Sequence, residues 1–222
     1  MTGPTLSRKR TQTRLKLLTA AAEVYVERGI LGSSVEQICE RAGFTRGAFY
    51  SNFESREALC LELLERQRLF YQDAFARGVA DTVAHFAAHP QDRQLPPYDL
   101  VGLALDLVVP HLFQTRAQDQ VWTMAGLLYG EMWMYAVREP SFREPFAAYE
   151  RSWSQPFAVL LEQVFQAGGL TLTTSVAEAI HVLSAVFERS TRDALVSDDP
   201  GARIERVRAD LLGVARLITR PR

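Results

Sequence analysis

Apolar residues recur at helical spacing along almost the whole chain, and few stretches show the alternation that marks a strand. The first helix is predicted over about residues 13–28, and Gly29 marks its end. One face of this helix carries Leu15, Leu18, Ala22 and Tyr25. Two short helices follow over about residues 34–41 and 45–51, and a long helix begins after Ser55 and continues to Gly78 or beyond.

The rest of the chain divides at proline, glycine and polar segments. Residues 90–97 are polar and contain prolines, which is typical of a connection. Pro156 should kink or split the helix that contains it, because proline lacks a backbone donor. The predicted fold class is all-α, with about nine helices and no sheet. The later helices are expected at about residues 98–113, 118–138, 141–168, 175–196 and 200–219.

The two short helices and the glycine turn between them form a helix-turn-helix. Ser34 can cap the first of them, and Gln37 stands at the spacing from which a side chain completes a capping box. Gly43 supplies a turn conformation outside the helical region, and Thr45 can cap the second helix. In such a motif the first helix supports the second, which presents its side chains to the major groove of DNA.

Residue sizes along this motif fit that role. Gly47 and Ala48 are small enough for the helix backbone to approach base edges closely. Phe44 and Phe49 fit the inward face and should hold the three N-terminal helices together. Cys39 lies on the inward face of its helix, where a cysteine behaves as a small core residue rather than as a nucleophile.

Charge is distributed unevenly along the chain. Residues 1–56 hold nine basic and five acidic side chains, so their net charge is +4, while the remainder carries −5. A cationic end on an anionic body suggests a head that binds nucleic acid, although a solvated surface explains four charges equally well. No apolar run reaches the length of a membrane helix, and no signal segment follows the basic N-terminus. A cytoplasmic location is therefore expected.

The residues of the motif carry a family resemblance. Gly29, Ser34, Val35, Ile38, Ala42 and Gly43 are followed by the block GFTRGAFYSNFESREALCLEL. From Thr13 to Leu64 the chain resembles the N-terminal domain of the tetracycline-repressor (TetR) family of bacterial transcription regulators. It departs from that pattern in three places, where Arg56 replaces a usual lysine, Asn52 an aromatic residue or histidine, and Ala48 a threonine. The last change could alter which bases are read.

The resemblance implies two domains and a set of DNA contacts. Residues 10–55 would form the TetR-type helix-turn-helix DNA-binding domain, and residues 56–222 the effector-binding and dimerisation domain. Arg46 is the expected base-reading side chain, because its guanidinium can pair with guanine through two hydrogen bonds. Thr45, Gly47 and Ala48 would also contact bases or the adjacent DNA backbone. The expected phosphate contacts are Ser33, Ser34, Tyr50, Asn52 and Arg56. The N-terminal Arg8, Lys9, Arg10 and Arg14 could reach flanking DNA, or form a solvated tail.

The same resemblance places a homodimer interface on the last two helices. The apolar stripes that permit it contain Ile180, Leu183, Phe187, Leu211, Leu212, Ala215 and Ile218, with the protomer's own core as the alternative. The middle helices would bind a small apolar or aromatic effector. Its candidate contacts are Asp106, His111, Phe113, Trp122, Tyr129, Trp133 and Trp153, with Glu131 as a further polar anchor. Aromatic residues at this spacing can equally belong to a core.

The expected function is ligand-responsive transcription regulation. A homodimer would bind a palindromic operator in double-stranded DNA, and the effector would favour a state that releases it. Repression is expected, because it is the usual mode of the family. A regulator controlled by a protein partner is the main alternative, and an all-α enzyme is a second one.

Little in the sequence favours an enzyme. His85 and His89 are four residues apart, a spacing that can hold a metal ion from one helical face, but no third ligand stands beside them in the sequence. No phosphate-binding loop, nucleophile elbow or dinucleotide fingerprint occurs. The sequence therefore predicts a protein that is not an enzyme and that uses no cofactor and no metal.

Overall fold

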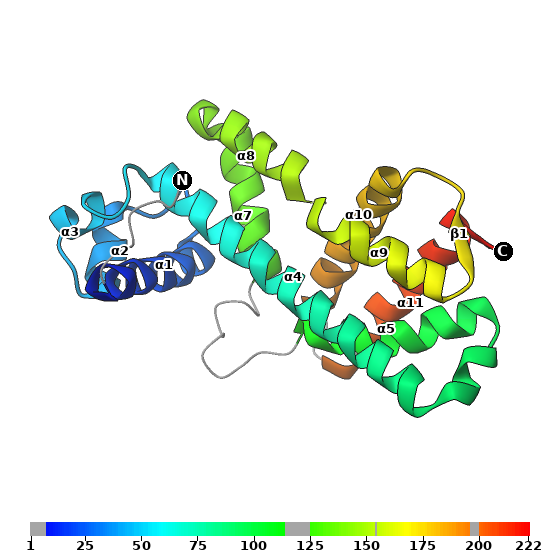
Figure 1. Ribbon diagram of the computed structural model, residues 1–222. Helices are drawn as coiled ribbons and strands as arrows, with labels where there is room; N and C mark the ends of the chain where they lie inside the picture. The colour runs from blue at the N-terminus through cyan, green and yellow to red at the C-terminus, as the bar shows by residue number, and fades with distance from the viewer. Residues whose placement is uncertain (1–7, 114–124, 154, 196–199) are drawn as a thin grey trace, which may run out of the picture. The chain divides into compact units, whose positions relative to one another are not determined.

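The all-α prediction is confirmed in the computed structural model, which describes residues 8–113, 125–153, 155–195 and 200–222 (Figure 1). These residues form ten α-helices, one 3-10 helix and two short strands. Contacts divide the chain into two compact units. No helix in the described ranges combines the length and the hydropathy that crossing a bilayer requires.

Unit 1 contains the N-terminal helices together with two helices from the middle of the chain. It comprises α1 (Arg8–Arg28), α2 (Val35–Ala42), α3 (Arg46–Tyr50), the first part of α4 (Arg56–Ala88) as far as Gln67, α7 (Ala125–Arg138), and α8 (Pro140–Trp153) as far as Tyr149. This grouping extends well beyond the expected 10–55 domain. The chain from residue 56 onward is therefore shared between both compact units rather than forming one body.

Large side chains fill the core of unit 1. Tyr25 of α1, Phe49 of α3 and Leu59 of α4 are all fully buried, and so is Met132 of α7. They belong to one apolar cluster that spans α1, α2, α3, the first part of α4, α7 and the start of α8. Burying a large aliphatic or aromatic side chain stabilises a fold by about 1.5–3 kcal/mol, so this shared cluster fixes α3 firmly in place.

Unit 2 contains the remainder of α4, η1 (Pro90–Gln94), α5 (Pro97–Phe113), α9 (Gln155–Ala167), β1 (Leu170–Leu172), α10 (Val176–Leu195), α11 (Pro200–Ile218) and β2 (Thr219–Pro221). Helices α10 and α11 pack against each other, and Ser190 Oγ donates a hydrogen bond of 2.5 Å to Asp210 Oδ2 between them. Helix α5 packs on α11.

The prediction of no sheet was wrong, because β1 and β2 pair antiparallel. Leu170 lies opposite Pro221 and Leu172 opposite Thr219. Gly169 has a φ of 67°, the left-handed conformation that glycine adopts without strain, and it turns the chain from α9 into β1. Strands of three residues are too short to show an alternating pattern, so no periodicity indicated them.

The predicted helices agree with the observed ones in most places. Helix α1 begins at Arg8, five residues before the predicted start at Thr13. The predicted helix over 141–168 is two helices, α8 ending at Trp153 and α9 beginning at Gln155, and Pro156 is the second residue of α9. The division that Pro156 predicted is thus present. The first part of the predicted 118–138 helix lies outside the described residues.

Helices α4 and α5 approach each other closely at Gly78. A methyl group at this position would lie 2.6 Å from the Val108 Cα, which is closer than non-bonded carbon atoms approach each other in proteins. Only glycine allows this backbone contact without a shift of one helix. The contact brings the two helices together within unit 2.

Candidate nucleic-acid interface

The start of α2 and the turn between α2 and α3 have the predicted local structure. Ser34 accepts a hydrogen bond from the Gln37 backbone N–H, and the Gln37 side-chain oxygen accepts from the Ser34 backbone N–H at 2.9 Å. This reciprocal pair is the predicted capping box. Gly43 has φ 71° and ψ 35°, so the left-handed turn expected of it is also confirmed.

Helix α3 buries one side and exposes the other. Thr45 caps it by accepting a hydrogen bond of 3.3 Å from the Ala48 backbone N–H, and Phe49 is fully buried in the core of unit 1. The opposite side carries the exposed Arg46 and Gly47, and Tyr50, of which 51% is exposed. A short helix held by a buried aromatic side chain therefore presents a small, partly basic face to solvent.

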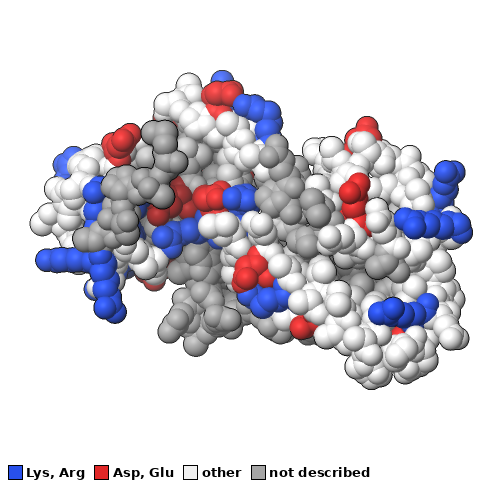
Figure 2. Space-filling model, in the orientation of Figure 1, with Lys and Arg blue, Asp and Glu red and all other residues white. Residues whose placement is uncertain are grey.

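Basic side chains gather around this part of unit 1. Figure 2 shows blue side chains over the end of the unit that holds α1 and α3. Arg46 forms an ion pair of 2.8 Å with Glu36 of α2, and both side chains are more than half exposed. A hydrogen bond with Tyr50 and the charge of Glu36 raise the pKa of Arg46. The guanidinium is thus kept charged and held above the exposed face.

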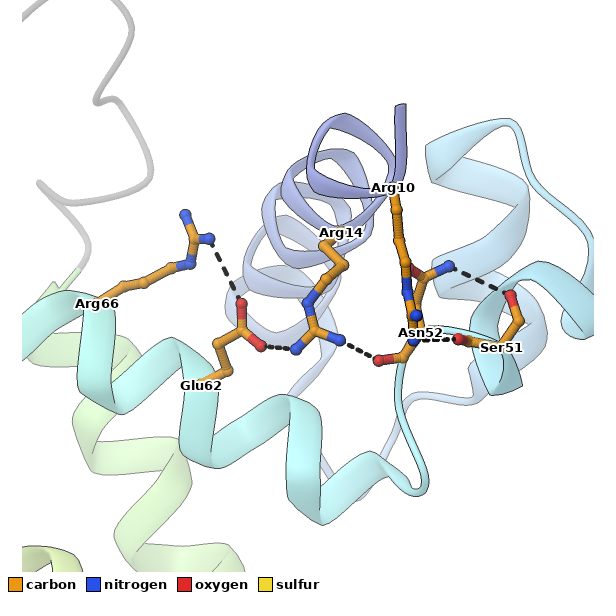
Figure 3. A network of polar contacts seen from close by, with 6 residues as sticks. All are labelled: Arg10, Arg14, Ser51, Asn52, Glu62 and Arg66. Carbon is orange, nitrogen blue, oxygen red and sulfur yellow. Dashed lines mark hydrogen bonds and ion pairs between the residues drawn. The ribbon is translucent and has the colours of Figure 1, made fainter. Parts of the chain in front are cut away.

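Two arginines of α1 bind the end of α3 instead of extending away from the protein (Figure 3). Arg10 donates a hydrogen bond of 3.0 Å to the Ser51 backbone oxygen, and Arg14 donates to the Asn52 backbone oxygen. Arg14 also pairs with Glu62 of α4, and its guanidinium lies 4.3 Å from the centre of the Phe53 ring. These contacts give Arg14 a positioning role at the end of the exposed helix.

Three of the expected phosphate contacts are turned into the protein. Ser33 is buried and donates to the Ile30 backbone oxygen at 2.8 Å. Arg56 donates to the backbone oxygens of Ile30 at 3.3 Å and of Ser33 at 3.2 Å. The Asn52 amide donates to the Ala48 backbone oxygen at 2.8 Å, and its Oδ1 is buried. These side chains shape the helix-turn-helix, and the geometry offers them little room for phosphate.

Helix α7 supplies polar contacts to unit 1 that sequence reasoning missed. Tyr135 accepts a hydrogen bond of 3.0 Å from Arg56 and donates one of 2.5 Å to Glu57. Burial, together with the hydrogen bond to Glu57, raises the pKa of Tyr135 to about 12. Glu131 accepts a bond of 3.1 Å from the Ile30 backbone N–H, so it has a structural partner within unit 1. More than 70 residues separate these partners in the chain, and no local pattern could have indicated them.

Unit 2 contains an apolar cavity of about 150 Å³. Its walls come from α4, α5, α9, α10 and α11, and they include Tyr71, Phe75, Leu105, Phe157, Leu183 and Phe187. Two of the lining side chains, Tyr71 and Ser184, carry a hydroxyl group. A second cavity of about 300 Å³ shares Val101, Ala104 and Val164 with it. The two cavities therefore adjoin along one wall.

None of the expected effector contacts whose side chains are described lines either cavity. Asp106 is ion-paired with Arg208, and His111 lies 2.7 Å from Asp81 Oδ2. Phe113 packs near Val109, Tyr129 packs against Phe146 in unit 1, and 51% of Trp133 is exposed. Trp122 and the side chain of Trp153 lie outside the described residues.

The expected dimer residues face the interior of unit 2 instead of forming an outer surface. The cavity is lined by Ile180, Leu183, Phe187, Leu211 and Ala215. Leu212 packs against the cluster around Val101, and Ile218 is half-buried. These residues thus contribute to the protomer's own core, and their part in a homodimer interface stays a prediction.

The head of unit 1 is a helix-turn-helix whose second helix is exposed, and this arrangement defines a class of DNA-binding proteins. The sequence comparison agrees, since residues 17–63 match the family described as "Bacterial regulatory proteins, tetR family". Residues 17–63 are thus similar in sequence to the DNA-binding part of that family.

Curated relatives share part of this sequence, and solved structures share the fold. The HTH-type transcriptional repressor DhaR of Mycobacterium sp. (strain GP1) is 35% identical over 89 residues, 40% of this chain and 42% of the relative. The HTH-type transcriptional activator FasR of Mycolicibacterium smegmatis is 39% identical over 57 residues, 26% of each chain. The chain thus matches less than half the length of these relatives. A TetR-family transcriptional regulator from Cytophaga hutchinsonii has the same fold, with a TM-score of 0.67 at 17% identity over 99% of this chain and 100% of that one.

Proposed function

We propose that the protein is a DNA-binding transcriptional repressor, acting as a homodimer on a palindromic operator in the cytoplasm. One observation carries the proposal: α3 is fixed from below by the buried Phe49 and presents Arg46 and Tyr50 on its free side. A rigid short helix with an exposed arginine fits the major groove, where arginine pairs with guanine. Ser34, Thr45, Gly47 and Ala48 complete the proposed contact face.

The homodimer is proposed on the outward flanks of α10 and α11. The hydrogen bond between Ser190 and Asp210 sets the antiparallel register of these helices. Val182 and Ala185 lie on the exposed side of α10, and Gly213 and Leu217 lie on the exposed side of α11. Val182 is 40% exposed, Leu217 is 81% exposed, and a methyl group at Gly213 would meet nothing within 4 Å. An exposed apolar stripe with small residues at its centre suits close packing of two helix pairs.

Sedimentation velocity tests this interface with two substitutions. Leu217→Glu and Gly213→Glu place a charge on the outward stripe without filling the interior, so both should convert the dimer into a folded monomer. Glu205→Lys changes a charge at an exposed position about 80° or more around the same helix from Gly213 and Leu217, and it is the control. A dimer that survives both stripe substitutions would show that the interface lies elsewhere.

The cavity in unit 2 is the proposed effector site. An apolar cavity of this volume holds a molecule about the size of benzene. Together with the adjoining cavity it could hold a longer apolar molecule. Helix α4 carries the link to the head, because Tyr71 and Phe75 line the cavity while Arg56 and Glu57 of the same helix bind Tyr135. A ligand that displaces α4 would favour a state with weaker operator binding, and operator would weaken ligand binding by the same factor.

Selection of bound fragments from a random duplex pool tests the proposed function. The protein should enrich a palindrome whose half-sites are separated by about one helical turn of DNA, or by multiples of it. Transcription from a reporter that carries the palindrome should then fall when the protein is present. Failure to enrich any sequence would contradict the proposal, and increased transcription would identify an activator.

A further inference from the structure

The end of α4 brings together two histidines and an aspartate outside the regions described above. His85 lies in the last turn of α4, His89 follows the helix directly, and Asp92 lies in η1. One potential ligand atom of each residue lies within 4.8 Å of those of the other two. Sequence reasoning rejected a metal here because no third ligand stood beside the histidine pair. The chain supplies one by turning back at Pro90, so that Asp92 faces His85.

Hydrogen bonds already orient this group. His85 Nε2 lies 2.8 Å from Asp92 Oδ2, and the two imidazole rings stack with their centres 4.4 Å apart. His89 Nδ1 lies 3.1 Å from the His85 backbone oxygen. A carbonyl oxygen only accepts, so Nδ1 of His89 carries the proton and its Nε2 holds the free lone pair. Histidines that bind metals are commonly fixed in this way through their other ring nitrogen.

The geometry points to a binding site for a divalent transition-metal ion of the Zn²⁺ and Co²⁺ class. Two imidazole nitrogens and one carboxylate oxygen are donors that such ions prefer, whereas Mg²⁺ prefers oxygen alone. Ligand atoms around a tetrahedral zinc are about 3.3 Å apart, given zinc–ligand distances of about 2.0–2.1 Å. The pair formed by His85 and Asp92 therefore has to open by only about half an ångström. Water would fill the fourth position.

An ion at this site would fasten η1 to the end of α4. His85 is also in edge contact with Phe86, with the ring centres 5.7 Å apart, and Phe86 lines the second cavity. The metal would thus hold the connection between α4 and α5 next to that cavity wall. The three proposed ligands line neither cavity, so metal binding and effector binding would use different side chains.

Spectroscopy with cobalt tests the site in the full chain, prepared without a histidine tag and stripped with a chelator. One Co²⁺ ion per chain should give the visible absorption bands of a low-symmetry site, and Zn²⁺ should abolish them by displacement. His89→Ala and Asp92→Asn should each weaken Zn²⁺ binding in calorimetry by about 10–100-fold or more. His181→Gln removes an exposed histidine on α10 and is the matched control, with unchanged affinity.

Thermal unfolding provides a second measurement on the same variants. Zn²⁺ should raise the unfolding temperature of the unmodified chain and of His181→Gln, because it binds only the folded site. It should not raise that of His89→Ala. Circular dichroism checks that each variant is folded before titration. The proposal is overturned if His89→Ala and Asp92→Asn bind Zn²⁺ as tightly as the unmodified chain, or if the unmodified chain shows no saturable Co²⁺ site.

Discussion

The two compact units differ in how they use their interiors. Unit 1 closes around large side chains that form one continuous cluster. Unit 2 buries smaller clusters around Val101 and Val109, and an apolar cavity of about 150 Å³ lies among its helices. Unit 1 also fixes the end of its exposed helix with arginines, whereas the cavity of unit 2 is lined almost entirely by apolar side chains.

The difference corresponds to two physical requirements. A helix that reads base edges must hold its side chains at fixed positions, so each part of unit 1 is anchored by packing and hydrogen bonds. A site for a small apolar molecule needs empty volume, and empty volume costs packing energy. Tight packing in unit 1 and a cavity in unit 2 are therefore consistent with the proposed DNA-reading head and ligand-sensing body.

Removing the anchor of α3 should give the largest effect. Phe49→Ala leaves a void beneath the helix, and we expect a loss of about 3–5 kcal/mol in the free energy of unfolding. Tyr50→Ala, on the exposed side of the same helix, should change this free energy by about 0.5 kcal/mol or less. Urea denaturation followed by circular dichroism measures both. Equal losses in the two variants would show that α3 is not held from its inner side.

Removing Arg14 of α1, which contacts the end of α3, should have a smaller effect on the free energy of unfolding. Arg14→Ala deletes the ion pair with Glu62, the hydrogen bond to the Asn52 backbone and the contact with Phe53. We expect a loss of about 1–2 kcal/mol in unfolding free energy. Lys16→Ala removes the same charge from an exposed position on α1 and is the control. Similar losses would mean that charge alone matters, and that Arg14 does not position α3.

The pKa of Glu188 in unit 2 predicts how the free energy of unfolding depends on pH. Burial and the nearby charge of Glu150 raise the pKa of Glu188 to about 7. Between pH 4.5 and 7 the unfolded chain releases this proton while the folded chain keeps it, so stability falls as pH rises through this interval. Glu188→Gln should match the unmodified chain at pH 4 and exceed it by about 1–2 kcal/mol at pH 8, after allowance for screening. Denaturation at both pH values measures the difference, and a variant without any gain at pH 8 would contradict it.

Filling the cavity should have the smallest effect on stability and a large effect on ligands. Ala104 lines both cavities and is nearly buried, so Ala104→Leu places additional carbon atoms in the shared wall. We expect a gain of about 0.5–2 kcal/mol in unfolding free energy and loss of the heat of binding of benzene-sized molecules in calorimetry. Ala177→Leu, on the exposed side of α10, is the control. Ligand binding that persists in Ala104→Leu would place the effector outside the cavity.

Local signals in the sequence predicted the helix-turn-helix well. Ser34, Gln37, Gly43 and Thr45 each act on their near neighbours, and the structure confirms the cap or the turn that each predicts. The buried position of Phe49 followed from the helical period alone. The fold class followed from the same period, repeated along the chain.

Contacts between distant segments could not be predicted. Arg56 was expected to contact phosphate. Nothing near it in the sequence indicates that it donates hydrogen bonds to Tyr135 and to the Ile30 carbonyl instead. Tyr129 of α7 was expected around an effector, yet it packs against the core of unit 1, because an apolar stripe does not reveal which element it faces. Asp92 was overlooked as a partner of His85 because a turn, rather than helical spacing, brings them together.

The role of Arg46 in reading DNA is the central claim, and its most direct test compares affinities for two duplexes. Fluorescence anisotropy would measure the binding of the unmodified chain and of Arg46→Ala to the selected palindrome and to a scrambled duplex, at several salt concentrations. We expect Arg46→Ala to lose about 1–3 kcal/mol on the palindrome and less on the scrambled duplex, so that the preference for the palindrome falls. Equal losses on both duplexes, or no loss on either, would contradict the claim that α3 reads the sequence through Arg46.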